Sequence, residues 1–587
     1  MRISDVEAIT GLSGKSIRLY EAKGLISTKR SDNSYRYFDD ETVEKLKCIP
    51  VLRRVGISIS DIQLWQSKVI GTEEMLQKRI SQLKSESCAM ADQINLCHKL
   101  MEIPDAGLWW EITGNAKNST AKPLDEEAEE PLAQKTGEPV CVGVDIGTTT
   151  ISSVVICPKT GATYGVYTMR NGSDIPSKRP EEKMQDAKRL IERATRLLDF
   201  LVDKFSPDAA IGLTGQMHGI VYSSDAEVLS PLYTWQDGRV SAEFCDELRR
   251  LTGCGVAPGY GLATQIYLQR AGGLPESARY ISTIMDLFTA KLCGLSRPVS
   301  HATNAASLGF FDLKKGSFDA AALEKCGAAA DILPAVTAKT EIIGEYRGIP
   351  VAVAIGDNQA SFLGAIREQK CSALANFGTG SQISLVTDEI EGKAIGGEIE
   401  VRPYVDGRYL LCGSALCGGR AYAIVERFFR AYAVACGLPD SEQYEVLNRL
   451  AEKGVESGNV LRVRTTFSGT RGDPSMRGEI TGIGEDNFTP EALAAGCLYG
   501  MAGELYDIYR KIGGPHIGKL VASGNAIRKN RTLRRVLSEM FDMPVFTSRY
   551  GEEAARGAAI FAAAARYGEP AGDIAARCVK YETDGKG

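Results

Sequence analysis

A repeat of apolar positions, spaced alternately by four and three residues, runs from residue 76 to residue 101. Its members are Leu76, Ile80, Leu83, Ser87, Met90, Ile94, Cys97 and Met101. This heptad spacing puts the repeat on one helix face, so the pattern predicts a single long helix over residues 73–103. An apolar seam of this length is buried either against a second copy of the chain or against the chain's own body, and both remain open.

Two segments about 230 residues apart repeat one pattern of an apolar strand, a Gly-Thr turn and a second apolar strand. The first turn includes Gly147, Thr148 and Thr149, and the second consists of Gly378, Thr379, Gly380 and Ser381. Tight turns of this kind offer backbone N–H groups and hydroxyls to phosphate, and Asp145 beside the first turn can hold Mg²⁺ directly or through water. The repeat predicts a duplicated, two-lobed α/β architecture with a phosphate loop from each lobe facing one cleft.

The first 70 residues alternate short helix signals with turn signals. We predict a helix over 5–9, a turn at 11–13 with Ser13 as N-cap, and a second helix over 15–23 that stops at Gly24. Helix, tight turn and helix is the geometry that places a second helix in the DNA major groove. A small helical domain with a solvated basic face would show the same pattern.

Charge separates these residues, which we call the head, from the rest of the chain. The head has twelve Lys/Arg against nine Asp/Glu, whereas the whole 587-residue chain has a net charge of −5. A basic head on an acidic body suggests two functions. Residues 111–138 show no apolar period and include the acidic run 125–130, which predicts a flexible charged linker.

The composition, with 44% hydrophobic and 24% charged residues, is ordinary for a globular protein. Asp5 and Glu7 argue against a signal peptide, and the most apolar tract, 558–565, is too short to cross a membrane. Fifteen cysteines without a CxxC pair, and four scattered histidines, make a zinc site unexpected. We expect free, buried thiols and a cytoplasmic location.

The head resembles the DNA-binding domain of the MerR family, in which a recognition helix is followed by a wing. The matching segments are Ser16 to Tyr20 and Tyr35-Arg36-Tyr37-Phe38, although Ser34 stands where the family usually has glycine. The resemblance implies that the head binds double-stranded operator DNA and that the 73–103 helix forms an antiparallel homodimer. The expected DNA contacts are Lys15, Ser16, Arg18, Tyr20, Tyr35 and Arg36.

The body, residues 139–587, resembles the FGGY carbohydrate kinases from about Val140 to Tyr567. The similar segments include LTGQMHGIVY (213–222), TWQDGR (234–239), IGDNQASFLGA (355–365) and FSGTRGDP (467–474). The segments TNAASLGFFD (303–312), VRPYVDGRYLLCGSALCGGRAYAIVERFF (401–429) and ASGNAIRKNRTLRR (522–535) are most similar to the sedoheptulokinases of that family. The resemblance implies an actin-like, ribonuclease H-like fold of two lobes, with ATP and Mg²⁺ as cofactors.

Asp357 is the expected catalytic base. It follows the apolar run 351–355, so it lies at a strand's end, where α/β folds build their clefts. It matches the residue that accepts the sugar hydroxyl proton in the family. An Asp before the helical run 359–365 would also suit a helix N-cap, and the two roles are compatible.

Further site residues are implied by the same motifs. The expected sugar ligands are Gln216, Met217, His218, Trp235, Asp237, Asp286 and Asn358. The expected nucleotide and phosphate contacts are Thr148, Thr149, Gly378, Thr379, Gly380, Ser381, Gly524 and Asn525, with Asp145 for Mg²⁺. For Asp286 the alternative is a helix cap.

The predicted order is therefore a winged helix-turn-helix (1–70), a dimerisation helix (71–104), a linker (105–138) and two kinase lobes (139–368 and 369–587). The favoured function is ATP-dependent phosphorylation of a ketose, sedoheptulose, by a chain with a DNA-binding regulatory head. One alternative is a MerR-type regulator whose kinase-like body only senses sugar. Another is a head that merely dimerises. Retention of Asp145, Asp357 and both phosphate loops favours catalysis.

Overall fold

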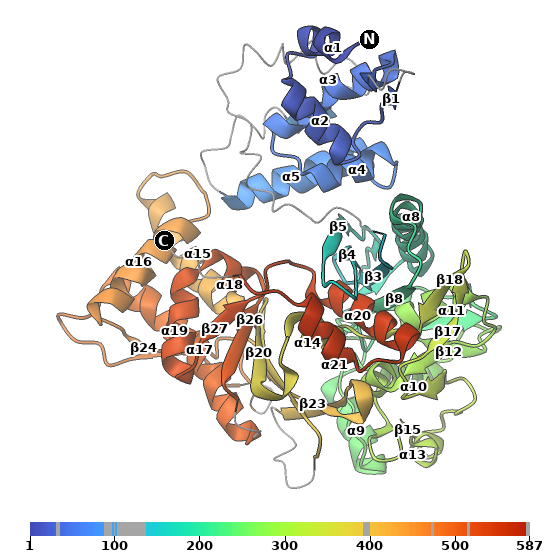
Figure 1. Ribbon diagram of the computed structural model, residues 1–587. Coiled ribbons are helices and arrows are strands. Elements are labelled where there is room, and N and C mark those ends of the chain that lie inside the picture. Colours follow the sequence, from blue (N-terminus) through green and yellow to red (C-terminus); the bar gives the residue numbers. More distant parts are fainter. Residues whose placement is uncertain are drawn as a thin grey trace. The chain divides into compact units, whose positions relative to one another are not determined.

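The structure is a computed structural model (Figure 1) that describes residues 1–30, 36–86, 97–98, 100–101, 137–390, 399–470, 473, 475–513 and 517–582. All but the last two residues of the predicted linker lie outside this range. The head and the body are separate units, and each is described by itself.

The head consists of short helices and a two-stranded wing. The helices are α1 (Ile3–Thr10), α2 (Gly14–Ala22), α3 (Asp40–Arg54) and α4 (Ile59–Gln66), and the wing pairs β1 (Lys29–Arg30) with β2 (Arg36–Tyr37). Gly11 turns the chain between α1 and α2 with a φ of 69°, which glycine adopts easily. The Ser13 hydroxyl caps α2 by accepting from the N–H of Ser16 at 3.1 Å. The predicted helix-turn-helix and its N-cap are confirmed.

The single long helix predicted over 73–103 is wrong. Helix α5 covers Thr72–Glu86, and the amide Nε2 of Gln77 donates to the sulfur of Met101 at 3.8 Å. One straight helix would hold these residues roughly 36 Å apart. The seam members Leu76, Ile80 and Leu83 are at most 1% exposed within a single copy of the chain. Heptad spacing identifies an apolar helix face but does not identify what packs against it. Here the chain's own residues cover the described part of the seam. That part is therefore not open for dimerisation.

The first lobe of the body is built on a sheet whose strand order is β17-β18-β8-β3-β4-β5, with β19 also paired to β8. The bounds are β3 (Cys141–Ile146), β4 (Thr150–Ile156), β5 (Thr163–Arg170), β8 (Ala210–Gly215), β17 (Ile342–Tyr346), β18 (Ile349–Ala352) and β19 (Ile355–Gly356). Strands β3 and β4 form an antiparallel hairpin, whereas β3 and β8 are parallel. Helices α8 (Ala187–Phe205) and α11 (Ile284–Cys293) pack on this sheet.

The second lobe repeats this topology in the strand order β22-β23-β21-β20-β26-β27. The bounds are β20 (Ser372–Phe377), β21 (Ser381–Thr387), β22 (Ile399–Pro403), β23 (Tyr409–Ala415), β26 (Lys519–Ser523) and β27 (Val545–Thr547). Here β20 and β21 form the antiparallel hairpin and β20 runs parallel to β26, as β3 does to β8. Both predicted hairpins are therefore confirmed, and they occupy equivalent places in two similar sheets.

Helices α14 (Asp357–Ala365) and α20 (Glu553–Tyr567) pack against each other, and α20 also lies on β3, β4 and β8. Glycines make this approach possible. A Cβ on Gly143 would overlap the carbonyl of Ala555, and one on Gly557 would overlap the carbonyl of Ala360. The alanine-rich tract 558–565 is thus a buried helix between two layers, and no helix among the described residues is long and apolar enough to span a membrane.

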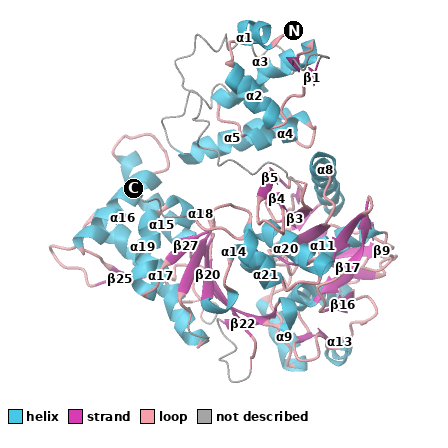
Figure 2. Cartoon of the chain, in the orientation of Figure 1, coloured by secondary structure: helices cyan, strands magenta, loops and turns pink. Residues whose placement is uncertain are grey.

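The remaining elements surround these layers, as Figure 2 shows by element type. In the first lobe they are α9 (Ala242–Thr252), α10 (Gly261–Arg270), α12 (Ala302–Ala305), η4 (Ala306–Leu308) and α13 (Ala320–Lys325), with small sheets formed by β6 (Asp174–Ile175), β7 (Met184–Gln185), β9 (Val221–Ser224), β10 (Glu227–Val228), β11 (Leu232–Tyr233), β12 (Tyr280–Ser282), β13 (Val299–His301), β14 (Phe311–Asp312), β15 (Ser317–Phe318) and β16 (Ala335–Thr337). In the second lobe they are α15 (Gly419–Ala435), α16 (Tyr444–Ser457), α17 (Pro490–Ile512), α18 (Asn525–Lys529), α19 (Arg531–Phe541), α21 (Ala571–Cys578), β24 (Arg462–Arg464) and β25 (Glu479–Thr481). Every described cysteine is a free thiol, and most of them are buried, as expected.

Candidate active site

Asp357 is the first residue of α14, directly after the short strand β19. The preceding N–H, that of Gly356, donates to the Thr303 hydroxyl at 3.2 Å and fixes the start of the helix. Gly356 is the N-cap, so the alternative of Asp357 as N-cap is wrong. Burial raises the pKa of Asp357 to about 6, against the opposing charge of Arg402 and two backbone N–H groups. A carboxylate with this pKa is mostly ionised at pH 7 and is a competent proton acceptor.

Asp145 lies near the end of β3 and is electrostatically coupled to Asp357. Burial, and then the charges of Asp357 and Glu552, raise its pKa well above the ordinary value. Its Oδ1 is buried without a hydrogen-bond partner among the described residues. A buried carboxylate oxygen that is coupled to two further acids is satisfied either by a proton or by a bound cation.

The chemistry of Asp145 fits Mg²⁺. The described residues contain no cluster of three or more His, Cys, Asp or Glu side chains able to hold a metal by themselves. That is the usual situation for Mg²⁺, which keeps several waters and binds one or two carboxylates together with substrate phosphates.

The first phosphate loop follows Asp145 and is held by buried amides. The side chain of Asn171 donates to the Gly147 carbonyl at 3.0 Å, and that of Gln185 donates to the Thr148 carbonyl at 2.7 Å. With the carbonyls occupied in this way, the loop keeps a fixed shape. Thr149 is exposed, and the Thr148 hydroxyl accepts from the indole N–H of Trp235 at 3.0 Å. Asn171 and Gln185 were not predicted from the sequence, because each is a single amide residue outside any recognisable motif.

Gln216, Met217 and His218 continue from β8 beside this loop. Gln216 donates to the Oε1 of Gln185 at 2.9 Å. Met217 is buried, and its sulfur lies close to Gly356. His218 has a φ of 69°, and its backbone N–H donates to the Ser307 hydroxyl at 3.0 Å. Its Nδ1 lies 2.7 Å from the Ser307 carbonyl, which can only accept, so Nδ1 is the protonated nitrogen.

Two expected sugar ligands, Asp237 and Asp286, have other contacts in the structure. Asp237 is 1% exposed, and both of its oxygens accept from Arg239, at 2.6 and 2.9 Å. Asp286 is fully buried within α11 and accepts from Ser300 at 2.7 Å, and burial raises its pKa to about 7. The cap of α11 is Thr283. Asp286 is the third residue of α11 and hydrogen-bonds back to Thr283, as in a capping box, so the helix-cap alternative is supported. The sugar contacts of Asp237 and Asp286 stay predictions.

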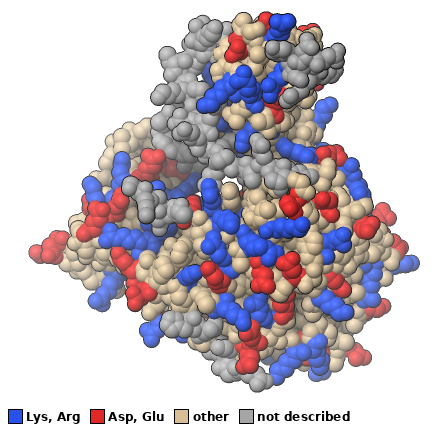
Figure 3. Space-filling view, viewed as in Figure 1, with Lys and Arg blue, Asp and Glu red and all other residues tan. Residues whose placement is uncertain are grey.

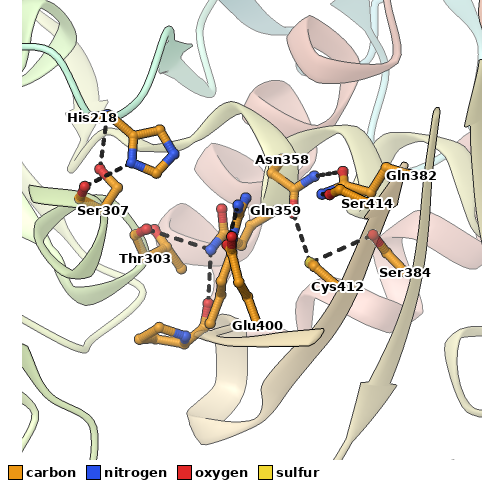
Figure 4. Close-up of polar contacts among 12 residues, drawn as sticks. His218, Thr303, Ser307, Asn358, Gln359, Gln382, Ser384, Glu400, Cys412 and Ser414 are labelled. Atoms are coloured by element: carbon orange, nitrogen blue, oxygen red, sulfur yellow. Dashed lines mark hydrogen bonds and ion pairs between the residues drawn. The ribbon is translucent and has the colours of Figure 1, made fainter. Parts of the chain in front are cut away.

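Trp235 is exposed and Asn358 is half-buried. The indole of Trp235 is 46% exposed and is anchored to Thr148 only through its N–H, which leaves ring surface open. Asn358 hydrogen-bonds across to the second lobe: its amide donates to Gln382, and its Oδ1 accepts from the Cys412 thiol at 3.2 Å. Figure 4 shows Asn358 between these two partners, with Ser384 and Ser414 behind them. Asn358 thus joins the lobes next to the candidate base.

The second phosphate loop is packed backbone to backbone against two other glycine turns. The N–H of Gly419 donates to the Gly378 carbonyl at 2.8 Å, and that of Gly418 to the Thr379 carbonyl at 3.1 Å. Gly524 has a φ of 96°, and a Cβ there would overlap the Phe377 carbonyl. The Ser381 hydroxyl is buried without a described hydrogen-bond partner. These segments form a narrow cradle suited to phosphates.

The start of α15 also contacts this loop, and none of its residues was among the expected phosphate contacts. Gly418 is its N-cap, and the Arg420 N–H donates to the Thr379 carbonyl at 3.1 Å. These N–H groups are used within the protein, so what the start of α15 offers to an anion is the exposed cation Arg420. The Gly-Gly-Arg sequence before a helical run was the available signal. Asn525 begins α18 as expected, and its side chain lies outside the described residues.

The expected DNA contacts differ in exposure and in partners. Lys15 and Arg18 are exposed on α2, and Ser16 is half-buried there. Tyr20 is only 6% exposed, so its ring belongs to the head's core, and its expected DNA contact is corrected to a packing role. The Arg36 guanidinium bonds to Glu21 at 2.6 Å. Tyr35 lies outside the described residues. Figure 3 shows basic side chains on the visible face of the head.

Three family-wide sequence profiles match this chain. The profile of the MerR helix-turn-helix family of regulatory proteins matches residues 1–68. The N-terminal and C-terminal domains of the FGGY family of carbohydrate kinases match residues 140–374 and 374–566. The boundary between the two kinase profiles falls within β20, at the start of the second lobe.

Among curated proteins, the sedoheptulokinases of Mus musculus and Homo sapiens are each 25% identical to this chain. Each alignment covers 72% of this chain and 97% of the relative. Among solved structures, xylulose kinase from Rhodospirillum rubrum (TM-score 0.66, 20% identity) and gluconate kinase from Lactobacillus acidophilus (TM-score 0.66, 19% identity) share the fold, over 76% of this chain and 93% of theirs. The chain therefore belongs to the FGGY family of carbohydrate kinases, and its kinase body is preceded by a MerR-type helix-turn-helix domain.

Proposed function

We propose that the body transfers the γ-phosphate of ATP to a ketose, sedoheptulose, to give sedoheptulose 7-phosphate. The observation that supports this most directly is the pair of coupled acids, Asp357 and Asp145, with one glycine loop from each lobe. Asp357 has a pKa of about 6, and Asp145 has a buried oxygen that lacks a described partner. The choice of sedoheptulose rests on the sedoheptulokinase relatives, which align over 97% of their length.

In the proposed reaction, Asp357 accepts the proton of the sugar hydroxyl that attacks the γ-phosphorus. Asp145 holds Mg²⁺, which neutralises charge on the phosphates when it is bound. The loops 147–149 and 378–381 orient the phosphates through backbone N–H groups. His218, Gln216 and Trp235 bind and orient the sugar. As the sugar oxygen bonds to the γ-phosphorus, the bond from that phosphorus to the β-phosphate oxygen breaks and ADP leaves. Asp357 then releases its proton to solvent and is ionised again.

The test is phosphorylation of a panel of ketoses by the full chain with ATP and Mg²⁺. We expect turnover with sedoheptulose exceeding that with xylulose, ribulose and fructose. Replacing Asp357 by Asn should lower kcat by about 10²- to 10⁴-fold, because general-base catalysis contributes about that much. A wild-type chain that binds sugar but turns over none of them would support the alternative of a sugar-sensing regulator.

We further propose that the head binds double-stranded operator DNA through the exposed face of α2, with Lys15 and Arg18 against phosphates or bases. The match to the MerR family over residues 1–68 supports this. The expected homodimer seam gains no support, because its described members are already buried. A DNA-binding ATP-dependent enzyme with free thiols suits the cytoplasm, where we place it.

A further inference from the structure

One face of the second-lobe sheet carries polar side chains where a buried sheet normally has apolar ones. Ser384, Cys412 and Glu400 are cross-strand neighbours on β21, β23 and β22, and Arg402 follows two residues after Glu400 on the same face. We call these four residues the polar row. The thiol of Cys412 donates a hydrogen bond to Asn358, which follows the candidate base Asp357 in the chain. The polar row therefore faces the start of α14.

Glu400 and Arg402 form an ion pair at the edge of this row. The Arg402 guanidinium donates to one carboxylate oxygen of Glu400 from Nη2 at 2.6 Å and from Nε at 3.1 Å. Their side chains retain 14% (Arg402) and 24% (Glu400) exposure, so the pair is recessed but not sealed.

The surroundings of the pair belong to the expected sugar site of the first lobe. Strand β22 packs against α12 and η4, and η4 includes Ser307, which binds both the backbone and the ring of His218. The Arg402 guanidinium is within electrostatic reach of Asp357 and of Tyr260, whose ring stacks on His218 at 4.7 Å. Figure 4 shows Glu400 projecting from the sheet between Thr303 and Cys412.

We propose that Arg402 and Glu400 bind the hydroxyls of the acceptor sugar at the end remote from the phosphorylated hydroxyl, and so select long ketoses over short ones. The pair presents N–H donors and carboxylate acceptors side by side, which is what adjacent hydroxyls of a polyol require. An acceptor held by both lobes must span from Asp357 to β22. A ketopentose leaves the pair without its hydroxyl partners, whereas a ketoheptose satisfies it.

This inference rests on the proposed sugar kinase activity, and it adds a specificity element from the opposite lobe. The alternative is that the pair only stabilises the junction between the lobes. The two readings differ in what they predict for acceptors of different length, because a structural defect weakens every acceptor alike.

The test compares Arg402→Met with wild type for sedoheptulose and xylulose at pH 8.5, where Asp357 is ionised in both proteins. Methionine keeps the apolar stem and removes the donors. We expect the sedoheptulose KM to rise at least about tenfold, as for loss of a charged hydrogen bond, with the xylulose KM and the ATP KM changing less than about threefold. Arg402→Lys should recover part of the loss. Arg408→Met is the matched control, since Arg408 has a similar exposure of 16% and pairs with Gln369 and Asp406 instead.

A second readout does not require turnover. Sedoheptulose alone should raise the Tm of the wild-type chain and of Arg408→Met, and should raise that of Arg402→Met and Glu400→Gln much less. The inference would be overturned if Arg402→Met raised the KM for sedoheptulose and for xylulose equally. It would also be overturned if the variant left both the sedoheptulose KM and the sedoheptulose-induced Tm shift unchanged. A wild-type chain that phosphorylates no sugar, yet shows the Arg402-dependent Tm shift, would reject the proposed kinase function and retain this sugar contact.

Discussion

At the scale of single residues, the site contains buried acids with raised pKa values, and one carboxylate oxygen of Asp145 lacks a hydrogen-bond partner among the described residues. Asp145 is electrostatically coupled to Asp357 and to Glu552, and burial raises the pKa of Asp145 and of Asp357. Such an arrangement destabilises the fold and is retained where chemistry needs it. Two consequences are measurable, one on pH dependence and one on stability.

The first consequence concerns the rate below neutral pH. Asp357 must be ionised to accept a proton, and its pKa is about 6. We expect kcat/KM for the sugar to be constant above pH 7 and to fall about tenfold per unit below about pH 6. A pH–rate profile of the wild-type enzyme checks this. Arg402→Met should move the acid limb to higher pH, because the guanidinium favours the ionised form of Asp357.

The second consequence concerns stability without Mg²⁺. The pKa of Asp145 is higher in the folded than in the unfolded chain, so its ionisation opposes folding, and stability is lost as pH rises above the unfolded value. Asp145→Asn should therefore raise the Tm at pH 8 by at least about 2 °C. Asp237→Asn is the contrasting variant, since Asp237 is paired with Arg239 and should lose stability. A lower Tm for Asp145→Asn would contradict the account.

At the scale of elements, the sequence predicted hairpins and turns well and helix partners poorly. The two Gly-Thr hairpins, the helix-turn-helix and the strand that precedes Asp357 were predictable, since each depends on local residue order. The burial of the 76–101 seam within one chain was not predictable, because a heptad repeat does not show which surface packs against it. Asp237 and Asp286 matched family segments, but their pairing with Arg239 and Ser300 was not predictable from those segments. Arg402 lies in the similar segment 401–429, but the segment alone does not show that the Arg402–Glu400 pair faces the site from a distant strand.

The glycine contacts of α20 give a prediction at this scale. Gly557 has no room for a Cβ because the Ala360 carbonyl occupies its place. Gly557→Ala should lower the stability of the body by about 1–3 kcal/mol or more, as overpacking does. Gly572→Ala is the matched control, since Gly572 is also helical and its added Cβ would have its nearest neighbour at 3.7 Å. Denaturant unfolding of both variants checks this, and equal midpoints would contradict the packing argument.

Helix α2 gives a prediction for DNA binding. Lys15→Ala and Arg18→Ala should each weaken binding to a random-sequence duplex and reduce the slope of log affinity against log salt by about 1, if each neutralises one phosphate. Lys45→Ala is the control, because Lys45 is exposed on α3 and paired with Glu41. Fluorescence anisotropy over a salt series measures all four proteins. A loss for Lys45→Ala as large as for Arg18→Ala would argue for diffuse charge attraction instead of a defined α2 interface.

At the scale of the whole molecule, one chain combines a MerR-type head with an FGGY kinase body. The acids and both glycine loops needed for phosphoryl transfer are present together in the body, which favours an enzyme over a sensor that only binds sugar. A regulator derived from a kinase would be free to lose Asp357 or the loops while keeping the sugar contacts. The central claim is therefore that this chain still transfers phosphate.

The most direct test is ADP release by the full chain with ATP, Mg²⁺ and sedoheptulose, with Asp357→Asn in parallel. We predict steady turnover by the wild-type chain and a loss of about 10²- to 10⁴-fold in the variant, with the Tm shift induced by sedoheptulose retained in both. Equal ADP release by the two proteins would contradict the role of Asp357. No sugar-dependent release by the wild-type chain, with binding intact, would contradict the kinase account and leave a sugar-sensing regulator.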